Sequence, residues 1–584
     1  YIGVNATEAV NATADNSDIL IDGSPGAGFP VGLLKAGTGN VTVSSVATAI
    51  TDANHSGKNV VGASLTVDEA AGIGTATDAI ETGVGTLTVT ANTADVVNIQ
   101  NAGDLSIILI ANRDDGTGTG SDVIITNTLG SITASGAVSS PDNITLRTID
   151  NDDVTINDTV TSDNSGTIAL QAGKDLTLNA VVSSLAGTVI VEADHDNSNE
   201  GALTDTATGS ITTTNLLAAG HSVALDNVAT TLETLAGDAQ QNFTFDADDS
   251  YTVGTVNAVS GVTSEFGNID LDTDEIITVS QDVESLTGSV TITSDDTDAN
   301  NVAIVNIGAN VSGDDVQIDA LNTVSARINI TGATENAIGG TTLNADTGTL
   351  DIDGDVTAHG SIVLQGDANI ELTANLHADD SVTVEDNIEL DDVGPGAFSI
   401  TADDGNITFS AVLSADDSNL SLVLAAGDTV NFVGNVDASG GEEIHDLTVD
   451  AAIVHVDTET VTVENHLDLS GSEAVQVDGD ASVYTSNNGN ITFNANGNLD
   501  AVEVDTETLN LVATNGRVVL GTVGDSVPFA SLDIDADSDG SVGVGGAAAE
   551  LNGNITVTGE ITFAGSPNVD LSGDVSVTSN DAGA

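Results

Sequence analysis

One five-residue segment recurs along this chain and constrains its fold more than any other feature. "GNITF" occupies residues 405–409 and again 489–493, and "GNITV" occupies residues 553–557. The steps between them are 84 residues (489 − 405) and 64 residues (553 − 489), each close to a whole multiple of about 21. Related segments start at Gly166, Gly187, Gly209, Gly360 and Gly573. This spacing predicts stacked repeats, with equivalent segments in the same place of successive coils.

The segment itself is typical of a β-strand that follows a turn. Strict alternation places Ile407 and Phe409 on one face and Asn406 and Thr408 on the other. Asp- and Asn-rich turns such as "ADDG" and "SNNGN" separate these runs. The chain has only 6 prolines, which suits strands whose backbone N–H groups must all donate. An all-β fold is therefore expected.

Among all-β architectures, we expect a right-handed parallel β-helix (β-solenoid) with coils of about 21 residues, or roughly 28 coils in 584 residues. Aromatic residues make up only 2% of the chain, so the core must consist of Val, Ile, Leu and Ala, which stack well in rows. The alternative is a series of tandem β-sandwich domains, which would show a longer repeat and interdomain linkers.

The expected organisation has two parts. Residues 1–80 fit the repeat less well and contain a Pro-Gly turn, so we interpret them as an atypical N-terminal capping or docking segment. Residues 81–584 are expected to form the β-helix rod. The pattern continues to near Ser579 without an obvious cap, which predicts an edge that pairs with the next copy of the chain.

The segments "GNITF", "GNITV", "GSVTITS", "GTLDI" and "GDVSV" resemble the strand repeats of filamentous-haemagglutinin-like proteins and other giant bacterial surface adhesins. The resemblance covers about residues 80–580 as a repeat texture. It implies a right-handed parallel β-helix in an exported protein that forms fibres or surface layers. The chain departs from that class in its strong negative charge and in lacking a recognisable secretion domain at its N-terminus.

The charge of the chain limits its partners. Its 90 acidic residues against 7 Lys and Arg give a net charge of −83. Nucleic acids and anionic membrane surfaces attract cationic proteins, so neither is an expected partner. No apolar run approaches the roughly 18 residues of a membrane span. Cysteine is absent, which excludes disulfides and thiolate chemistry.

Two groups of Asp-rich turns suggest structural Ca²⁺, because Ca²⁺ prefers clustered oxygen ligands. "DIDADSDG" carries Asp533, Asp535, Asp537 and Asp539, and "DIDGD" carries Asp351, Asp353 and Asp355. The first begins like an EF-hand loop, but the twelfth position counted from Asp535 is Gly546 rather than Glu. The competing interpretation is that Asp simply favours turns and solubility.

Two further residue types are candidates for modification or metal binding. His445, His455 and His466 lie close together in the sequence, and His445 and His466 are one period apart. These two could stack on adjacent coils and bind metal ions. The alternative is that they are solvated turn residues. Asn-x-Ser/Thr motifs are glycosylation candidates in an extracellular protein. These are Asn5, Asn11, Asn40, Asn143, Asn157, Asn242 and Asn406.

The sequence thus predicts an extracellular structural protein at the cell surface, a head-to-tail homopolymer forming a filament, sheath or surface layer. Other cell-surface components are further expected partners. The first alternative is a cell-surface adhesin stalk. The second is a polysaccharide-active β-helix enzyme, since "GDD" at 313–315 resembles one piece of the polygalacturonase pattern. The Gly-His-Gly piece is missing between it and "RIN" at 327–329, so we expect no catalysis.

Overall fold

The chain is an all-β parallel β-solenoid of about 21 turns, with coils of about 23 residues. This confirms the expected β-helix over tandem sandwiches. The computed structural model describes residues 2–4, 9–23, 29–44, 48–55, 57–91, 95–113, 121–226, 230–295, 303–322, 326–331, 334–335, 339–345, 348–366, 369–391, 397–416, 419–436, 442–478, 481–503, 507–536, 549–564 and 568–579. These described residues form 67 β-strands and no helix. The right-handed winding remains a prediction. It rests on the general rule that crossovers between parallel strands are almost always right-handed.

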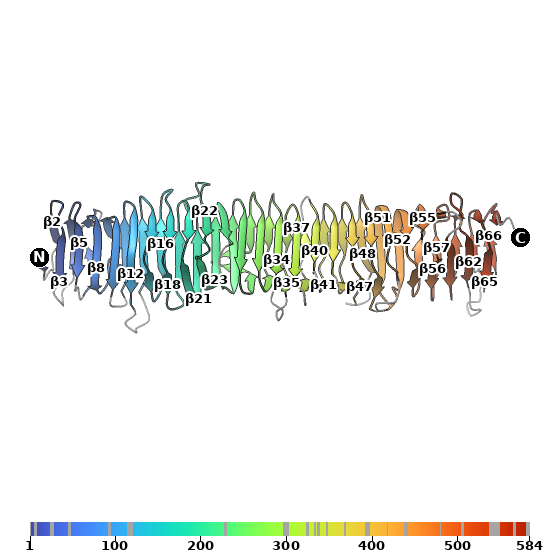
Figure 1. Cartoon of the computed structure of the whole chain (residues 1–584), viewed down its shortest axis with the longest axis horizontal. Coiled ribbons are helices and arrows are strands. Elements are labelled where there is room, and N and C mark those ends of the chain that lie inside the picture. Colours follow the sequence, from blue (N-terminus) through green and yellow to red (C-terminus); the bar gives the residue numbers. More distant parts are fainter. Residues whose placement is uncertain are drawn as a thin grey trace. The chain divides into compact units, whose positions relative to one another are not determined.

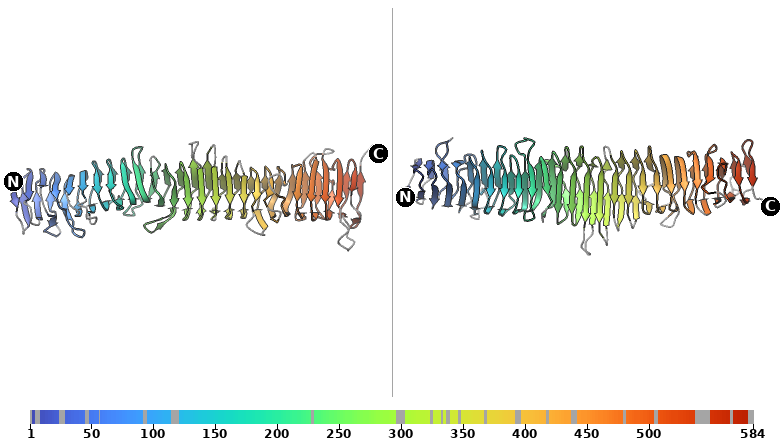
Figure 2. Two further views of the ribbon diagram at one scale, coloured as in Figure 1. Left: turned by 90° about the horizontal axis from the view of Figure 1, so that it is seen from below. Right: turned by 45° about the horizontal axis from the view of Figure 1, so that its top comes forward.

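The chain divides into two compact units, Tyr1–Gly288 and Ser289–Ala584. In the first unit, strands β13 (Val123–Asn127), β16 (Ile144–Thr148) and β19 (Thr167–Gln171) pair in parallel in successive coils. Because β13 pairs with β16 and β16 pairs with β19, each three places later, these coils hold three strands. Figures 1 and 2 show the strands of this unit lying side by side.

The second unit follows the same plan. Strands β43 (Ile362–Gln365), β46 (Val382–Val384) and β49 (Ile407–Phe409) form one of its parallel ladders. Coil length varies widely within this unit. Ile370 pairs with Ile388, a step of 18 residues (388 − 370), whereas Val518 pairs with Ala549, a step of 31 residues (549 − 518). The expected period of 21 was therefore too short, because turns of unequal length lie between strands of fixed register.

The core of each unit consists of rows of aliphatic side chains that point inward. Ile407 and Phe409 are fully buried, whereas Thr408 between them is half-buried on the outer face. This confirms the alternation expected for "GNITF". Phe409 stacks on Phe432 of the next coil, with ring centroids 5.7 Å apart and planes within 7°. Such row-by-row contact fills the interior with mainly aliphatic side chains and a few aromatic rings.

The three copies of the repeated segment do not occupy one ladder, which corrects the sequence expectation. The copies at 405–409 and 553–557 share a ladder. It runs through Ile407, Val430, Val454, Val475, Leu499, Val523 and Ile555. The copy at 489–493 lies in another ladder, because Ile491 pairs with Leu467 and Val518. The 84-residue step is therefore not a whole number of coils.

The Asn of the segment explains why it recurs in different ladders. In each copy its Oδ1 accepts a backbone N–H from the next coil: Asn406 from Thr429 at 3.1 Å, Asn490 from Arg517 at 2.8 Å and Asn554 from Ser576 at 3.0 Å. The motif therefore links one coil to the next wherever a strand begins.

The Gly of the segment is required by the close approach of the preceding coil. A Cβ at Gly405 would lie 2.5 Å from the carbonyl oxygen of Asp380, and one at Gly489 would lie 2.3 Å from that of Asn465. No side chain fits at either distance without a shift of the backbone. The repeat is thus fixed by local contacts between coils rather than by a constant period.

The described part of residues 1–80 has the same ladders as the chain that follows. Strands β3 (Ile19–Gly23), β5 (Asn40–Ser44) and β8 (Ser64–Ala70) pair in parallel, and β8 pairs with β10 (Thr86–Ala91). A capping or docking role for this segment remains a prediction.

At the other end, β64 (Ile555–Val557) pairs with β67 (Val577–Ser579), so the pattern continues to Ser579 as expected.

Candidate functional site

The three acids of "DIDGD" point to three different partners. Asp351 forms an ion pair with Arg327 at 3.0 Å, and burial raises the pKa of its carboxyl more than that partner lowers it. Asp353 Oδ1 accepts a hydrogen bond from the Thr373 hydroxyl at 2.6 Å, and Asp355 Oδ1 accepts one from the Asn375 backbone at 3.0 Å. The described contacts therefore give each acid a role in joining coils, and Ca²⁺ at this turn remains a prediction.

The second predicted Ca²⁺ turn lies partly within the described residues. Asp533 and Asp535 are half-buried on the outer face of β62 (Ser531–Ala536), where they pair with Asn510 and Val512. Oδ1 of Asp533 is buried without a hydrogen-bond partner among the described residues. Asp537 and Asp539 lie outside the described residues, so the four-acid turn remains a prediction.

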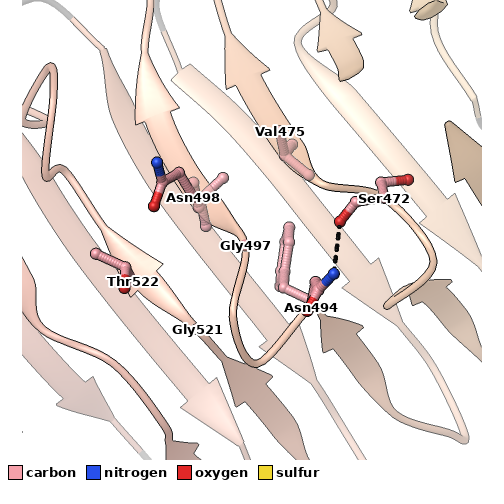
Figure 3. A pocket seen from close by; sticks show the side chains of 9 residues that line it. Ser472, Val475, Asn494, Gly497, Asn498, Gly521 and Thr522 are labelled. Atoms are coloured by element: carbon pink, nitrogen blue, oxygen red, sulfur yellow. Dashed lines mark hydrogen bonds between the residues drawn. The ribbon is translucent and has the colours of Figure 1, made fainter. Parts of the chain in front are cut away.

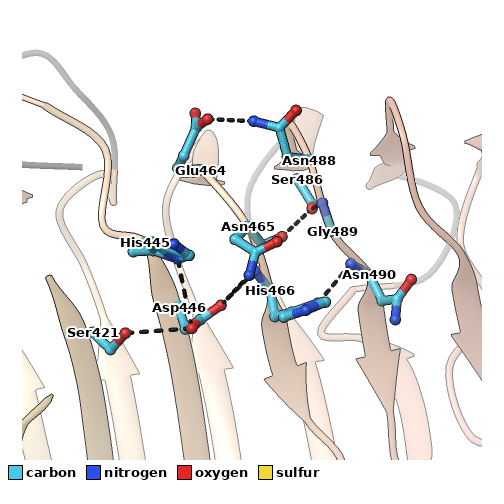
Figure 4. Close-up of polar contacts among 10 residues, drawn as sticks. All are labelled: Ser421, His445, Asp446, Glu464, Asn465, His466, Ser486, Asn488, Gly489 and Asn490. Atoms are coloured by element: carbon cyan, nitrogen blue, oxygen red, sulfur yellow. Dashed lines mark hydrogen bonds and ion pairs between the residues drawn. The ribbon is translucent and has the colours of Figure 1, made fainter. Parts of the chain in front are cut away.

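The structure places His445 and His466 on adjacent coils but not opposite each other (Figure 4). Leu447 pairs with Leu467, so His466 stands beside Asp446, and its backbone N–H donates to Asp446 Oδ1 at 3.0 Å. The same aspartate lies 3.5 Å from His445 Nδ1. His466 Nδ1 accepts the Asn490 backbone N–H at 3.0 Å. The His466 side chain thus joins two coils, whereas the His445 side chain contacts its neighbour in the sequence.

The third histidine of that set lies apart from the other two. His455 lies half-buried on the outer face of β52 (Asp446–Val456), between Asn431 and Gln476 of the neighbouring coils. None of the three histidines belongs to a group of three metal-ligating atoms within the part of the chain that the structure describes. The register favours the interpretation of His445, His455 and His466 as ordinary surface residues.

Most of the glycosylation candidates are accessible. Asn11, Asn40, Asn143, Asn157 and Asn242 are exposed, Asn406 is half-buried, and Asn5 lies outside the described residues. Several of these side chains already join coils: Asn143 Oδ1 accepts the Thr167 N–H at 2.8 Å, and Asn242 Oδ1 accepts the Asn268 N–H at 3.0 Å. These links between coils are sufficient to explain why Asn-x-Thr motifs are abundant. Glycosylation of these asparagines remains a prediction.

Two clusters of ligating side chains were missed from the sequence. One comprises Asp52, His55 and Asp78 in the first unit, and the other His377, Asp379 and Asp403 in the second. In each cluster, one ligating atom per residue lies within 4.8 Å of the other two. The second cluster combines residues of "HADD" and "TADDG", segments that share an Ala-Asp step at the end of a strand. That shared step is the signal that could have revealed it.

The first cluster has a structural explanation of its own. Asp52 Oδ1 accepts the Asn54 backbone N–H at 2.7 Å and the Asn59 side-chain amide at 2.6 Å, and Asp52 Oδ2 accepts the His55 backbone N–H at 2.6 Å. Burial raises the pKa of Asp52, but these hydrogen bonds outweigh it and leave the pKa below its ordinary value. Asp52 therefore stabilises a tight turn.

A small hollow lies between coils of the second unit (Figure 3). It is lined by Ser472, Val475, Phe493, Asn494, Gly497, Asn498, Leu499, Gly521 and Thr522. Asn494 Nδ2 donates to the Ser472 carbonyl at 3.0 Å across it. Its volume of about 10 Å³ matches the space that one water molecule needs. The hollow therefore suits a buried water rather than an organic ligand.

The fold and these contacts define the class of protein, a parallel β-solenoid whose turns carry coil-joining Asp, Asn and Ser side chains. Comparison with known protein families, curated proteins and solved structures finds no match to this chain. Within the described ranges, no helix is long and apolar enough to cross a membrane.

Proposed function

We propose that this protein is an extracellular structural protein, a subunit of a filament, sheath or surface layer at the cell surface. The observation that carries the proposal is the repetition of one coil plan through each unit, with aliphatic rows inside and hydrogen-bonded turns outside. Such repetition builds an extended body by nearest-neighbour contacts alone. A resemblance of the strand repeats to filamentous-haemagglutinin-like surface proteins supports the same role.

The surface chemistry supports an extracellular location. With only 7 Lys and Arg in 584 residues, the chain offers trypsin-like proteases few cleavage sites. Its net charge of −83 keeps copies apart in solution unless cations bridge them. Structural Ca²⁺ is therefore part of the proposal, as the ion that lets acidic copies associate.

Head-to-tail association of copies is the proposed mode of assembly. The described C-terminal strands are exposed: Val569, Leu571 and Val577 expose 40%, 51% and 47% of their surface. Apolar side chains and strand edges of this kind favour pairing with another strand, whether of a further coil or of another copy of the chain. A repeated head-to-tail contact that does not close into a ring yields an open filament.

Electron microscopy of the purified full chain, with and without Ca²⁺, tests the proposal. We expect regular polymers of this one chain in Ca²⁺ and their loosening by a chelator. A chain lacking residues 1–80 should fold, as judged by its β-type circular dichroism, but should not polymerise. Uniform monomers under all conditions would refute the structural role, and normal polymers of the truncated chain would refute the docking role of residues 1–80.

The ion in this experiment needs its own control. Mg²⁺ and NaCl at equal ionic strength screen charge as Ca²⁺ does. They do not bind to irregular groups of six to eight oxygen ligands, which Ca²⁺ accepts. If Ca²⁺ acts at specific turns, it alone should raise the melting temperature, and Asp533→Asn with Asp535→Asn should reduce that rise. Equal stabilisation by all three salts would show that the acids serve only as a solvated surface.

A further inference from the structure

We propose that His377, Asp379 and Asp403 form a binding site for a divalent transition-metal ion, with Zn²⁺ the ion that fits best. The site lies on the outer face of the second unit and goes beyond the proposed structural role. It also differs in ligand chemistry from the Asp-rich turns, because a histidine nitrogen takes part.

The register of three coils brings these residues together. Ala358 ends β42 (Val356–Ala358), Ala378 ends β45 (Leu376–Ala378) and Ala402 ends β48 (Ala397–Ala402), and the three alanines pair in one ladder. The residues that follow them, His359, Asp379 and Asp403, therefore share one turn position in successive coils.

The backbone holds that turn position in place. Asp379 N donates to the Ala358 carbonyl at 3.0 Å, and Asp403 N donates to the Ala378 carbonyl at 2.9 Å. Asp404 N donates to the Asp379 carbonyl at 2.8 Å, which fixes the next residue as well. The carboxylates of Asp379 and Asp403 are thus presented by an ordered ladder.

The ligating atoms are spaced for an ion rather than for direct hydrogen bonds. His377 Nε2 lies 3.7 Å from Asp379 Oδ1 and 3.8 Å from Asp403 Oδ2, both beyond hydrogen-bond distance. Ligands bound at about 2.0–2.2 Å to a tetrahedral Zn²⁺ lie roughly 3.3–3.6 Å from one another. The two distances from His377 Nε2 would therefore need to shorten by only a few tenths of an ångström, and ligating atoms of all three residues lie within 4.8 Å of one another.

His359 positions one of the ligands. Its Nδ1 lies 2.8 Å from Asp379 Oδ2, and an ionised carboxylate can only accept, so Nδ1–H is the donor. This contact directs Oδ1, the other oxygen, toward His377. Second contacts of this kind orient metal ligands and raise affinity by about 10- to 100-fold. His359 is accordingly a positioning residue.

The chemistry of the ligands selects the ion. One imidazole and two carboxylates suit Zn²⁺ and related transition metals, whereas Ca²⁺ and Mg²⁺ prefer oxygen alone. The four side chains are accessible to solvent, with 43% of His377 and 55% of Asp403 exposed. An ion can enter directly and keep a water molecule at its remaining position. The net charge of −83 also concentrates cations near the surface.

The Asp52 cluster provides an internal contrast. Both oxygens of Asp52 already accept backbone or amide hydrogen bonds, so binding an ion there would compete with a turn. Asp379 Oδ1 and Asp403 Oδ2, by comparison, face His377 at distances that a metal would shorten. The structure thus favours the second cluster as the metal site.

Zn²⁺ titration of the full chain by calorimetry tests the proposal, with excess Mg²⁺ and NaCl present to occupy and screen the other carboxylates. We expect one tight site per chain in the wild-type protein. His359→Gln should weaken that site by about tenfold, and His377→Gln and Asp403→Asn, which each remove a ligand, should weaken it more. Co²⁺ in place of Zn²⁺ should give a visible absorption band that His377→Gln abolishes.

The matched controls are His455→Gln, an outward histidine outside either cluster, and Asp52→Asn. Both should leave the tight site unchanged. The proposal fails if the wild-type chain shows no tight Zn²⁺ site. The cluster would then be only an ion pair in which His377 contacts two carboxylates. It also fails if His377→Gln and Asp403→Asn, checked for folding by circular dichroism, both bind Zn²⁺ as tightly as the wild type does.

Discussion

The interior of each unit and its turns differ in how strictly they specify a residue. Interior positions accept any aliphatic side chain of suitable size, as the ladder of Ile362, Val382 and Ile407 shows. Turn positions are specific, since Gly405 has no room for a Cβ and Asn406 must supply an acceptor to the next coil. The interior therefore stabilises the fold, and the turns set the register and carry the chemistry.

The largest effect should come from a charge placed in the interior. Ile407→Asp puts a carboxylate into a fully buried row and should cost several kcal/mol, because no partner or water replaces its hydration. Thr408→Asp, one residue further on the outer face, should change stability by about 0.5 kcal/mol or less. Thermal unfolding followed by circular dichroism measures both. Similar losses for the two variants would mean that the strand does not separate inside from outside.

Removal of an interior aromatic ring should have the next largest effect. Phe409→Ala should cost about 3–5 kcal/mol, since it leaves a cavity beside the stacked ring of Phe432. Phe409→Leu should cost clearly less, because it keeps most of the volume. A double-mutant cycle with Phe432→Leu should give a coupling of about 0.5–1.5 kcal/mol if the stack contributes beyond burial. Additive losses would assign the whole effect to burial.

The interior also contains polar groups, and these sharpen the comparison. Asn101 and Asn127 are fully buried and pair with each other in adjacent coils at a corner of the first unit. The Asn101 side-chain amide donates to Asn127 Oδ1 at 3.4 Å and to the Gly103 carbonyl at 2.8 Å. Asn127 in turn donates to the Gly103 carbonyl at 3.0 Å. Buried polar side chains are tolerated here because they satisfy backbone groups at the corner.

Loss of one such corner group should cost less than loss of a core ring. Asn127→Ala should destabilise by about 1–3 kcal/mol, because it leaves buried carbonyl groups without a donor. Thr126→Ala, on the outer face of the same strand, should have little effect. Hydrogen exchange of the amides in β13 and β16 is the most direct measurement. Equal protection in both variants would contradict a stabilising role for the corner asparagines.

These comparisons also show what the sequence could predict. Alternation in "GNITF" correctly predicted which side chains of each strand face inward, because a period of two follows from strand geometry alone. It could not predict which ladder holds Ile491, because coils of 18 to 32 residues accumulate an unpredictable offset. The same limit hid the His377 cluster, because Asp403 belongs to the next coil and meets His377 and Asp379 only when the alanine ladder is aligned.

The smallest effect concerns acids on the outer face, where burial and neighbouring charge act together. Asp246 lies opposite Asp272 on paired strands β26 (Phe243–Ala247) and β31 (Ile269–Thr273). Partial burial, followed by the charges of nearby aspartates such as Asp274, raises the pKa of Asp246 above its ordinary value of 3.8. The folded state therefore takes up a proton at a higher pH than the unfolded state. Ionised Asp246 destabilises the fold at neutral pH, and this penalty disappears as pH falls toward the ordinary value.

Asp246→Asn should accordingly stabilise the protein at pH 7, and the difference from wild type should vanish below about pH 4.

Asp52 provides the opposite case, because its hydrogen bonds hold its pKa below the ordinary value. The stability that ionised Asp52 contributes is present above the unfolded pKa and is lost as pH falls through the lower folded pKa. Asp52→Asn should therefore destabilise the protein at pH 7 and less so in strong acid. Melting temperatures of the two variants across pH 2–7 measure the contrast, and parallel pH profiles would show that neither carboxyl is perturbed by its surroundings.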